Sequence, residues 1–168
     1  YGDSETFYTA VKYADAQVGR IWQAVQYRQQ QFNEDWMIVI TTDHGRDSST
    51  GHNHGGQSAR EKSGWIYSNK RPLNERFTPD QSAIVDIMPS ILRHMQLQPP
   101  APVMYEVDGI PFTGALSVSN AAVQQQGQQL LLQWKAHAPN ETLTIWYYQG
   151  FSPKAQEPYQ QLTTVKAK

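Results

Sequence analysis

Apolar side chains in the first thirty residues fall on one face of a helix. They recur at alternating steps of four and three residues, at Phe7, Val11, Ala14, Val18, Ile21 and Val25. This spacing places them along one stripe of an α-helix, and Asp3 or Ser4 can cap the first turn by accepting a backbone hydrogen bond. The pattern predicts one long helix over residues 5–30, followed by a turn at residues 33–35.

A continuous apolar run then covers residues 36–41, with the sequence WMIVIT. Because apolar or β-branched residues fill every position, the run predicts a strand buried on both faces, as in a parallel sheet between helices. A second strand is predicted at residues 64–67 and a second helix from Asp86 to Met95, with Pro89 in its first turn, where a missing N–H is tolerated. Helices alternating with buried strands predict an α/β fold, here part of a doubly wound sheet.

The pattern changes after this second helix. A proline-rich run at residues 98–102 ends the helix and predicts a linker or a surface excursion. Beyond Gly114 the chain has four strand-like runs separated by turn formers, at residues 116–118, 130–134, 143–148 and 162–165. Four strands are fewer than the about seven of a complete sandwich. We therefore predict two domains: residues 1–114 form an α/β part, and residues 115–168 form a β-rich, truncated sandwich-like module.

Composition and charge exclude several classes of partner. The 168 residues carry 14 Lys and Arg against 15 Asp and Glu, so the chain lacks the excess of cations that binding to a nucleic-acid duplex requires. No apolar run is long enough to cross a membrane. The chain has no cysteine, which excludes disulfides and thiolate metal sites and leaves His, Asp and Glu as candidate metal ligands.

Three of the five histidines lie in one segment, ITTDHGRDSSTGHNHGG, which overlaps the end of the first predicted strand. Asp43 and His44 stand where ligands bind in open α/β sheets, at the carboxyl end of a strand. A carboxylate and an imidazole together suit Zn²⁺ or a similar ion. Two glycines after His54 allow the backbone to bring this third ligand back toward the same place. His52 is interpreted either as a support for a ligand or as a solvated side chain.

Simpler interpretations remain open for this segment. An isolated Asp-His-Gly after a strand is more often a turn than a site, and the histidines can merely decorate a loop of a binding module. A serine hydrolase is not indicated, because the chain has no Gly-x-Ser-x-Gly nucleophile elbow.

Four stretches in order resemble one enzyme family. They are FYTAVKYADAQVGRIWQAV, VITTDHGRDSSTGHNHGGQSAREKSGWIYSNK, AIVDIMPSILRHM and VDGIPF. Together they resemble the alkaline phosphatase superfamily over roughly residues 1–114, and most closely its bacterial branch of type I phosphodiesterases, nucleotide pyrophosphatases and sulfatase-like enzymes. The β-rich tail weakly resembles part of a fibronectin type III sandwich, in which Trp134 is the core tryptophan; an ordinary buried aromatic is an equal alternative.

The resemblance implies a two-metal site. In that family two divalent ions, usually zinc, hold both ends of a displacement at phosphorus, and a Thr or Ser nucleophile is transiently modified. Asp43 and His44 would bind the nucleophile-side ion and His54 the other ion. Arg60, with Glu61, would at most support a ligand, and a solvated pair is the alternative. The family's nucleophile and three further ligands precede the stretches matched here, so we expect no catalytic residue in this chain and little activity from it alone.

These expectations define a function and its alternatives. The chain is expected to be part of a divalent-metal-dependent phosphodiesterase, nucleotide pyrophosphatase or phosphatase that acts on a small phosphoester or nucleotide. A sulfatase of the same superfamily is one alternative, although such enzymes favour calcium with oxygen ligands. A non-catalytic binding module is the other alternative. By resemblance, the periplasm or the cell exterior is the expected location.

Overall fold

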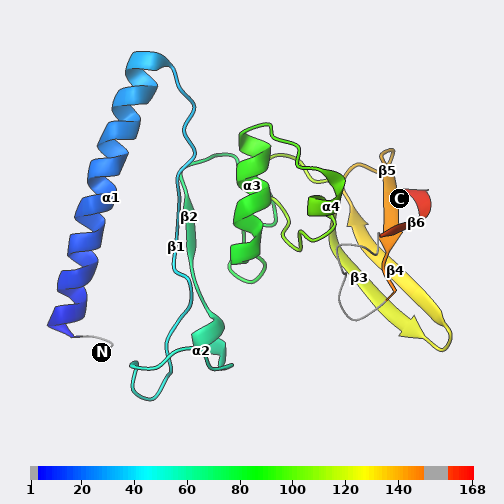
Figure 1. Ribbon diagram of the computed structural model, residues 1–168, viewed down its shortest axis with the longest axis horizontal. Coiled ribbons are helices and arrows are strands. Elements are labelled where there is room, and N and C mark those ends of the chain that lie inside the picture. Colours follow the sequence, from blue (N-terminus) through cyan, green and yellow to red (C-terminus); the bar gives the residue numbers. More distant parts are fainter. Residues whose placement is uncertain (1–3, 150–158) are drawn as a thin grey trace. The chain divides into compact units, whose positions relative to one another are not determined.

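The computed structural model describes residues 4–149 and 159–168, and the chain divides into two compact units, Tyr1–Lys70 and Arg71–Lys168. Among the described residues the strands form three sheets of two strands each, all antiparallel (Figure 1). None of these strand pairs is parallel. The described residues do not test the predicted doubly wound sheet, which stays a prediction. The predicted domain boundary at residues 114 and 115 lies inside the second unit and also stays a prediction.

The first helix, α1, spans Glu5–Phe32. The Ser4 hydroxyl accepts a hydrogen bond from the Phe7 N–H at 3.2 Å and caps its start; the other predicted cap, Asp3, lies outside the described residues. Asn33 ends the helix with φ 52°, and its N–H bonds the Gln29 carbonyl at 3.1 Å. The predicted helix is confirmed and continues two residues further.

The apolar stripe of α1 is largely open to solvent. Val25 is buried, whereas Phe7 is 48% and Ile21 59% exposed. An ion pair between Arg28 and Glu34 holds the turn that follows the helix. In the described part of the chain, no helix is long and apolar enough to cross a membrane. Because most of the apolar stripe is exposed, backbone hydrogen bonds and the two caps are the main interactions that stabilise α1 here.

Strands β1 (Val39–Thr41) and β2 (Ile66–Ser68) pair antiparallel, with Ile40 opposite Tyr67. The first strand was predicted three residues too long. Before β1, the side chain of Asn69 takes the place of a paired strand: its Oδ1 accepts the Ile38 N–H at 2.7 Å, and its Nδ2 donates to the Trp36 carbonyl at 3.0 Å. The loop between the strands contains a four-residue helix, α2 (Ala59–Lys62).

The second unit is organised around a buried carboxylate. A 3₁₀ turn, η1 (Ile84–Asp86), leads into α3 (Ile87–His94), which confirms the predicted second helix. Asp86 is fully buried; its carboxylate accepts two bonds from Arg76, at 2.7 and 3.1 Å, and backbone N–H bonds from Ala83 at 2.8 Å and Ile110 at 2.7 Å. One side chain thus joins the start of α3 to two segments that are distant in sequence.

The segment after residue 108 is attached to the same helix. The Ser90 hydroxyl donates to the Asp86 carbonyl at 2.7 Å and accepts the Phe112 N–H at 2.9 Å. Phe112 is fully buried and packs edge to face on Phe77, with 5.1 Å between ring centroids. A Cβ atom on Gly109 would lie 1.9 Å from the Val85 carbonyl oxygen, so glycine is required for this approach.

Residues 101 and 102 are helical, so the prediction of a linker was wrong for this end of the run at residues 98–102. Helix α4 (Ala101–Met104) begins inside that run, directly after Pro100. Proline lacks only the N–H that the first turn of a helix leaves unbonded, so Pro102 does not prevent this short helix.

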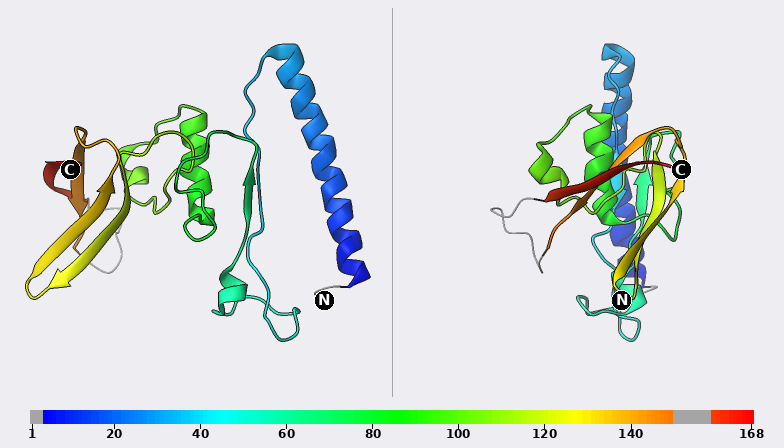
Figure 2. Two further views of the ribbon diagram at one scale, coloured as in Figure 1. Left: turned by 180° about the vertical axis from the view of Figure 1, so that it is seen from behind. Right: turned by 90° about the vertical axis from the view of Figure 1, so that its right-hand side faces the viewer.

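Two hairpins complete the second unit. They are β3 (Val118–Gln126) with β4 (Gln129–Ala136), and β5 (Thr142–Tyr147) with β6 (Gln160–Lys166). Figure 2 shows the first as a long twisted ribbon. Four strands were predicted and four are present, but the first was misplaced at residues 116–118. Strand β3 also contains the glutamines at residues 124–126, because pairing with β4 stabilises an extended conformation at these polar positions.

Candidate metal centre

The loop from residue 42 to residue 65, between β1 and β2, brings the three predicted metal ligands together. The His44 Nε2 atom lies 3.2 Å from the Asp43 Oδ2 atom. The rings of His44 and His54 stack with 4.5 Å between centroids and an interplanar angle of 21°. Asp43 and His44 are therefore adjacent, and the imidazole of His54 lies against the ring of His44.

The orientation of His44 suits metal binding. Its Nδ1 atom lies 2.7 Å from the Gly45 carbonyl oxygen, which accepts the Nδ1 proton. Because Nδ1 is engaged by this carbonyl oxygen, Nε2 is the ring nitrogen that faces Asp43 and would bind a metal ion. Two ligand atoms on one tetrahedral zinc lie about 3.3 Å apart, given bonds of about 2.0–2.1 Å. The 3.2 Å between His44 Nε2 and Asp43 Oδ2 fits that spacing.

The three side chains do not converge on a single point. Among the described residues there is no group of three or more His, Asp or Glu side chains placed to hold one metal ion. His54 meets His44 through its ring face rather than through a shared ligand position. The Asp43 side chain is 85% exposed and that of His44 is 36% exposed, so an ion has open access to the pair. A pair plus a neighbouring imidazole is the arrangement present.

Asp47 organises the turn before the histidine cluster. Its carboxylate accepts backbone N–H bonds from Ser49 at 3.0 Å, Thr50 at 2.7 Å and Asn53 at 2.8 Å. The hydroxyls of Ser49 and Thr50 also donate to it. These donors, the Ser49 hydroxyl foremost, lower the pKa of Asp47 below its ordinary range. The carboxylate is therefore charged and closes the loop from residue 47 to residue 53.

A second carboxylate closes the other side of the loop. Ser58 caps α2 and forms a reciprocal pair with Glu61, whose Oε2 accepts the Ser58 hydroxyl at 2.6 Å. The Glu61 Oε1 atom accepts the Gly56 N–H at 3.0 Å. The Ser58 hydroxyl is the main cause of a lowered pKa at Glu61.

Gly45 allows the strand end to touch α2 directly. Its N–H bonds the Glu61 carbonyl at 2.9 Å, and a Cβ atom at this position would lie 1.9 Å from the Arg60 carbonyl oxygen. Arg60 thus contributes a backbone contact beside His44. His52 also takes part through its backbone, since its carbonyl accepts a bond from Arg46 at 3.0 Å. The predicted roles of the Arg60 and His52 side chains stay predictions.

The sequence does not single out Asp47, and for Glu61 it allows either support of a ligand or a solvated pair with Arg60. A signal for Glu61 was present, because Ser-x-x-Glu is the pattern of a capping box. For Asp47 the pattern Asp-Ser-Ser-Thr predicts a local turn. It does not predict the hydrogen bond from the N–H of Asn53, the residue before His54, to the Asp47 carboxylate.

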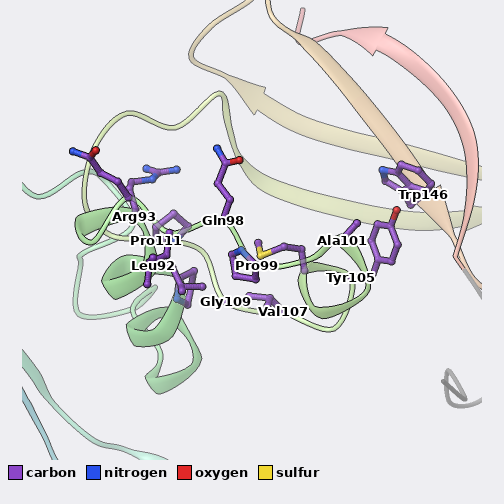
Figure 3. A pocket seen from close by; sticks show the side chains of 14 residues that line it. Leu92, Arg93, Gln98, Pro99, Ala101, Tyr105, Val107, Gly109, Pro111 and Trp146 are labelled. Carbon is purple, nitrogen blue, oxygen red and sulfur yellow. The ribbon is translucent and has the colours of Figure 1, made fainter.

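Two hollows in the second unit contain none of these ligands. One, of about 810 Å³, is lined by side chains that include Leu92, Tyr105 and Trp146 (Figure 3). Another, of about 360 Å³, is lined by residues that include Glu75 and His137. All three predicted ligands lie in the loop between β1 and β2 instead.

Comparison of the chain with protein-family models, with curated proteins and with solved structures gave no match.

Proposed function

We propose that this chain is part of a divalent-metal-dependent phosphoester hydrolase, a phosphodiesterase, nucleotide pyrophosphatase or phosphatase. Asp43, His44 and His54 would be three of its metal ligands, and the nucleophile would lie outside these 168 residues. The observation that carries the proposal is the close approach of His44 to both Asp43 and His54. The substrate would be a small phosphoester or a nucleotide.

The donor set supports zinc rather than calcium or magnesium. Two of the three groups are imidazoles, which suit zinc, whereas calcium and magnesium prefer oxygen ligands. With its Nδ1 atom bonded to the Gly45 carbonyl, His44 would bind the ion through Nε2. The same argument favours a phosphoester substrate over a sulfate ester, because the sulfatase alternative is associated with calcium.

The zinc ion and the side chains that hold it would have different roles in the reaction. A bound zinc ion polarises a phosphoryl oxygen and lowers the pKa of a coordinated water. Asp43 contributes a negative charge that offsets part of the charge of the ion, and the neutral imidazoles leave the site net positive toward an anionic substrate. The exposed face of the pair leaves room for the phosphoester to approach.

Zinc titration of the full chain tests this proposal. We expect the unsubstituted chain to bind zinc, and His44→Ala and His54→Ala to bind it at least about tenfold more weakly, because each removes a ligand. His94→Ala is the matched control, since His94 lies in α3. Equal zinc affinity in all four proteins would contradict the site.

Binding of inorganic phosphate separates the proposed substrate class from its alternative. We expect the zinc-loaded chain to bind phosphate in preference to sulfate, and the metal-free chain to bind neither. A preference for sulfate, or phosphate binding that is independent of zinc and of His44, would contradict a phosphoester hydrolase.

A further inference from the structure

Two carboxylates hold the backbone on either side of His54. Asp47 Oδ2 accepts the Asn53 N–H at 2.8 Å, one residue before His54, and Glu61 Oε1 accepts the Gly56 N–H at 3.0 Å, two residues after it. We propose that Asp47 and Glu61 are positioning residues that fix His54 against His44 before any metal binds. The inference rests on the proposed function, because it treats His54 as a metal ligand.

Asp47 clamps the residue before His54 with two bonds. Its carboxylate accepts the Asn53 N–H, and its own N–H donates to the Asn53 carbonyl at 2.9 Å. Both backbone groups of Asn53 are thus bonded to a single residue. The bonds from Ser49 and Thr50 hold the carboxylate in place for this clamp. The start of the His54 segment has little freedom to move away from residue 47.

Glu61 joins the segments that carry the two histidines. Its side chain holds Gly56, and its backbone carbonyl accepts the N–H of Gly45, the residue after His44, at 2.9 Å. A Cβ atom on Gly56 would lie 2.6 Å from the carboxylate oxygens, so the Glu61 side chain would have to shift for any larger residue here. One residue in α2 therefore sets the position of both histidine segments.

Neither carboxylate is itself placed as a metal ligand. The oxygens of Asp47 and Glu61 are occupied by N–H and O–H donors from the loop. Their effect is to order the backbone on both sides of His54 during folding, so that less entropy is lost when this side chain turns toward an ion. Groups that orient metal ligands in this way typically change metal affinity about 10–100-fold when they are removed.

The chain offers substitutions that separate the clamp from the turn. Asp47→Asn keeps an oxygen for the Ser49 and Thr50 N–H groups but places an NH₂ group opposite the Asn53 N–H. Glu61→Gln keeps an oxygen for Gly56, whereas Glu61→Ala removes it. We expect the zinc dissociation constant to rise about tenfold in Asp47→Asn and Glu61→Ala, and to stay near that of the unsubstituted chain in Glu61→Gln. Asp15→Asn, in exposed α1, controls for loss of one charge.

Two readouts distinguish positioning from a general loss of structure. In the cobalt-loaded chain, the visible spectrum is expected to change in Asp47→Asn as it does in His54→Ala, and to be unchanged in Glu61→Gln. In the metal-free chain, the nuclear Overhauser contact between the His44 and His54 rings is expected to disappear in Asp47→Asn and Glu61→Ala while the resonances of the second unit stay in place.

The possible results separate this inference from the proposed function. If the unsubstituted chain binds no zinc, the proposed function is contradicted, and the ring contact alone then supports or overturns positioning. If it binds zinc and Asp47→Asn and Glu61→Ala bind it equally well, the inference is overturned while the metal site stands. An unchanged ring contact in both of these variants overturns it as well.

Discussion

Asp47 in the first unit and Asp86 in the second use the same device in different surroundings. Each carboxylate accepts several backbone N–H bonds and joins segments that would otherwise separate. Asp86 is fully buried and paired with Arg76, whereas Asp47 is half-buried and bonded only to nearby loop donors in the contacts above. Burial and pairing with a cation thus make Asp86 a determinant of the fold, whereas Asp47 orders the loop of the candidate site.

Removing the buried carboxylate is expected to have the largest effect. Asp86→Ala should lower the free energy of unfolding of the second unit by about 3–5 kcal/mol, because it leaves the Arg76 guanidinium largely buried without its partner. Urea denaturation followed by tryptophan fluorescence measures this. Asp47→Ala is the matched variant, with a much smaller shift. Equal midpoints for the two variants would remove the distinction between fold and site.

Two glycines extend the same comparison. Gly109→Ala and Gly45→Ala each place a Cβ atom 1.9 Å from a carbonyl oxygen, a clash expected to cost about 1–3 kcal/mol. In Gly109→Ala the loss should appear as a lower denaturation midpoint for the second unit. In Gly45→Ala it should appear chiefly as weaker zinc binding, since the site lies beside this position.

Gly19→Ala is the control for both glycine variants. Gly19 lies in the middle of α1, and a Cβ atom added there would meet nothing within 4 Å. Because glycine loses more backbone entropy in a helix than alanine, Gly19→Ala should raise the free energy of unfolding by about 0.5–1 kcal/mol. If Gly45→Ala weakened zinc binding no more than Gly19→Ala does, the contact between the strand end and α2 would have no role in the site.

The smallest expected effect is a pH dependence in the second unit. Glu75 binds Lys135 at 2.7 Å and His137 at 2.7 Å, and also accepts the Ser119 hydroxyl. These partners, Lys135 foremost, lower the pKa of Glu75 to about 2. A carboxylate with a lowered pKa stabilises the fold above its ordinary pKa and loses that contribution as the pH falls through about 2.

The matched measurement compares the unsubstituted chain with Glu75→Gln. Denaturation midpoints at pH 6 and pH 3 should fall more for the unsubstituted chain, because the variant has no carboxylate to protonate. Parallel falls in the two proteins would show that Glu75 does not join residues 71–114 to the hairpin of β3 and β4.

Local patterns predicted what local physics determines. The stripe and cap of α1 and the helix after Asp86 follow from spacing and residue type, and Asp43, His44 and His54 were predicted within one loop. The start of β1 could not be predicted, because before it the side chain of Asn69 takes the place of a strand partner.

Other features depend on distant partners. Strand β3 contains glutamines that extend only because β4 pairs with them. The sequence does not show that Asp86 is buried and paired, because Arg76 and Ile110 reach it only in the folded unit. The doubly wound sheet and the missing ligands are predictions that the described residues do not test.

The sharpest test of zinc binding by Asp43, His44 and His54 is X-ray absorption at the zinc edge. In the zinc-loaded full chain it should show nitrogen and oxygen ligands at about 2.0–2.1 Å with the multiple scattering of imidazole. That imidazole signal should weaken in His44→Ala and in His54→Ala and stay intact in His94→Ala. An unchanged spectrum in the first two variants, or zinc bound by oxygen alone in the unsubstituted chain, would contradict the claim.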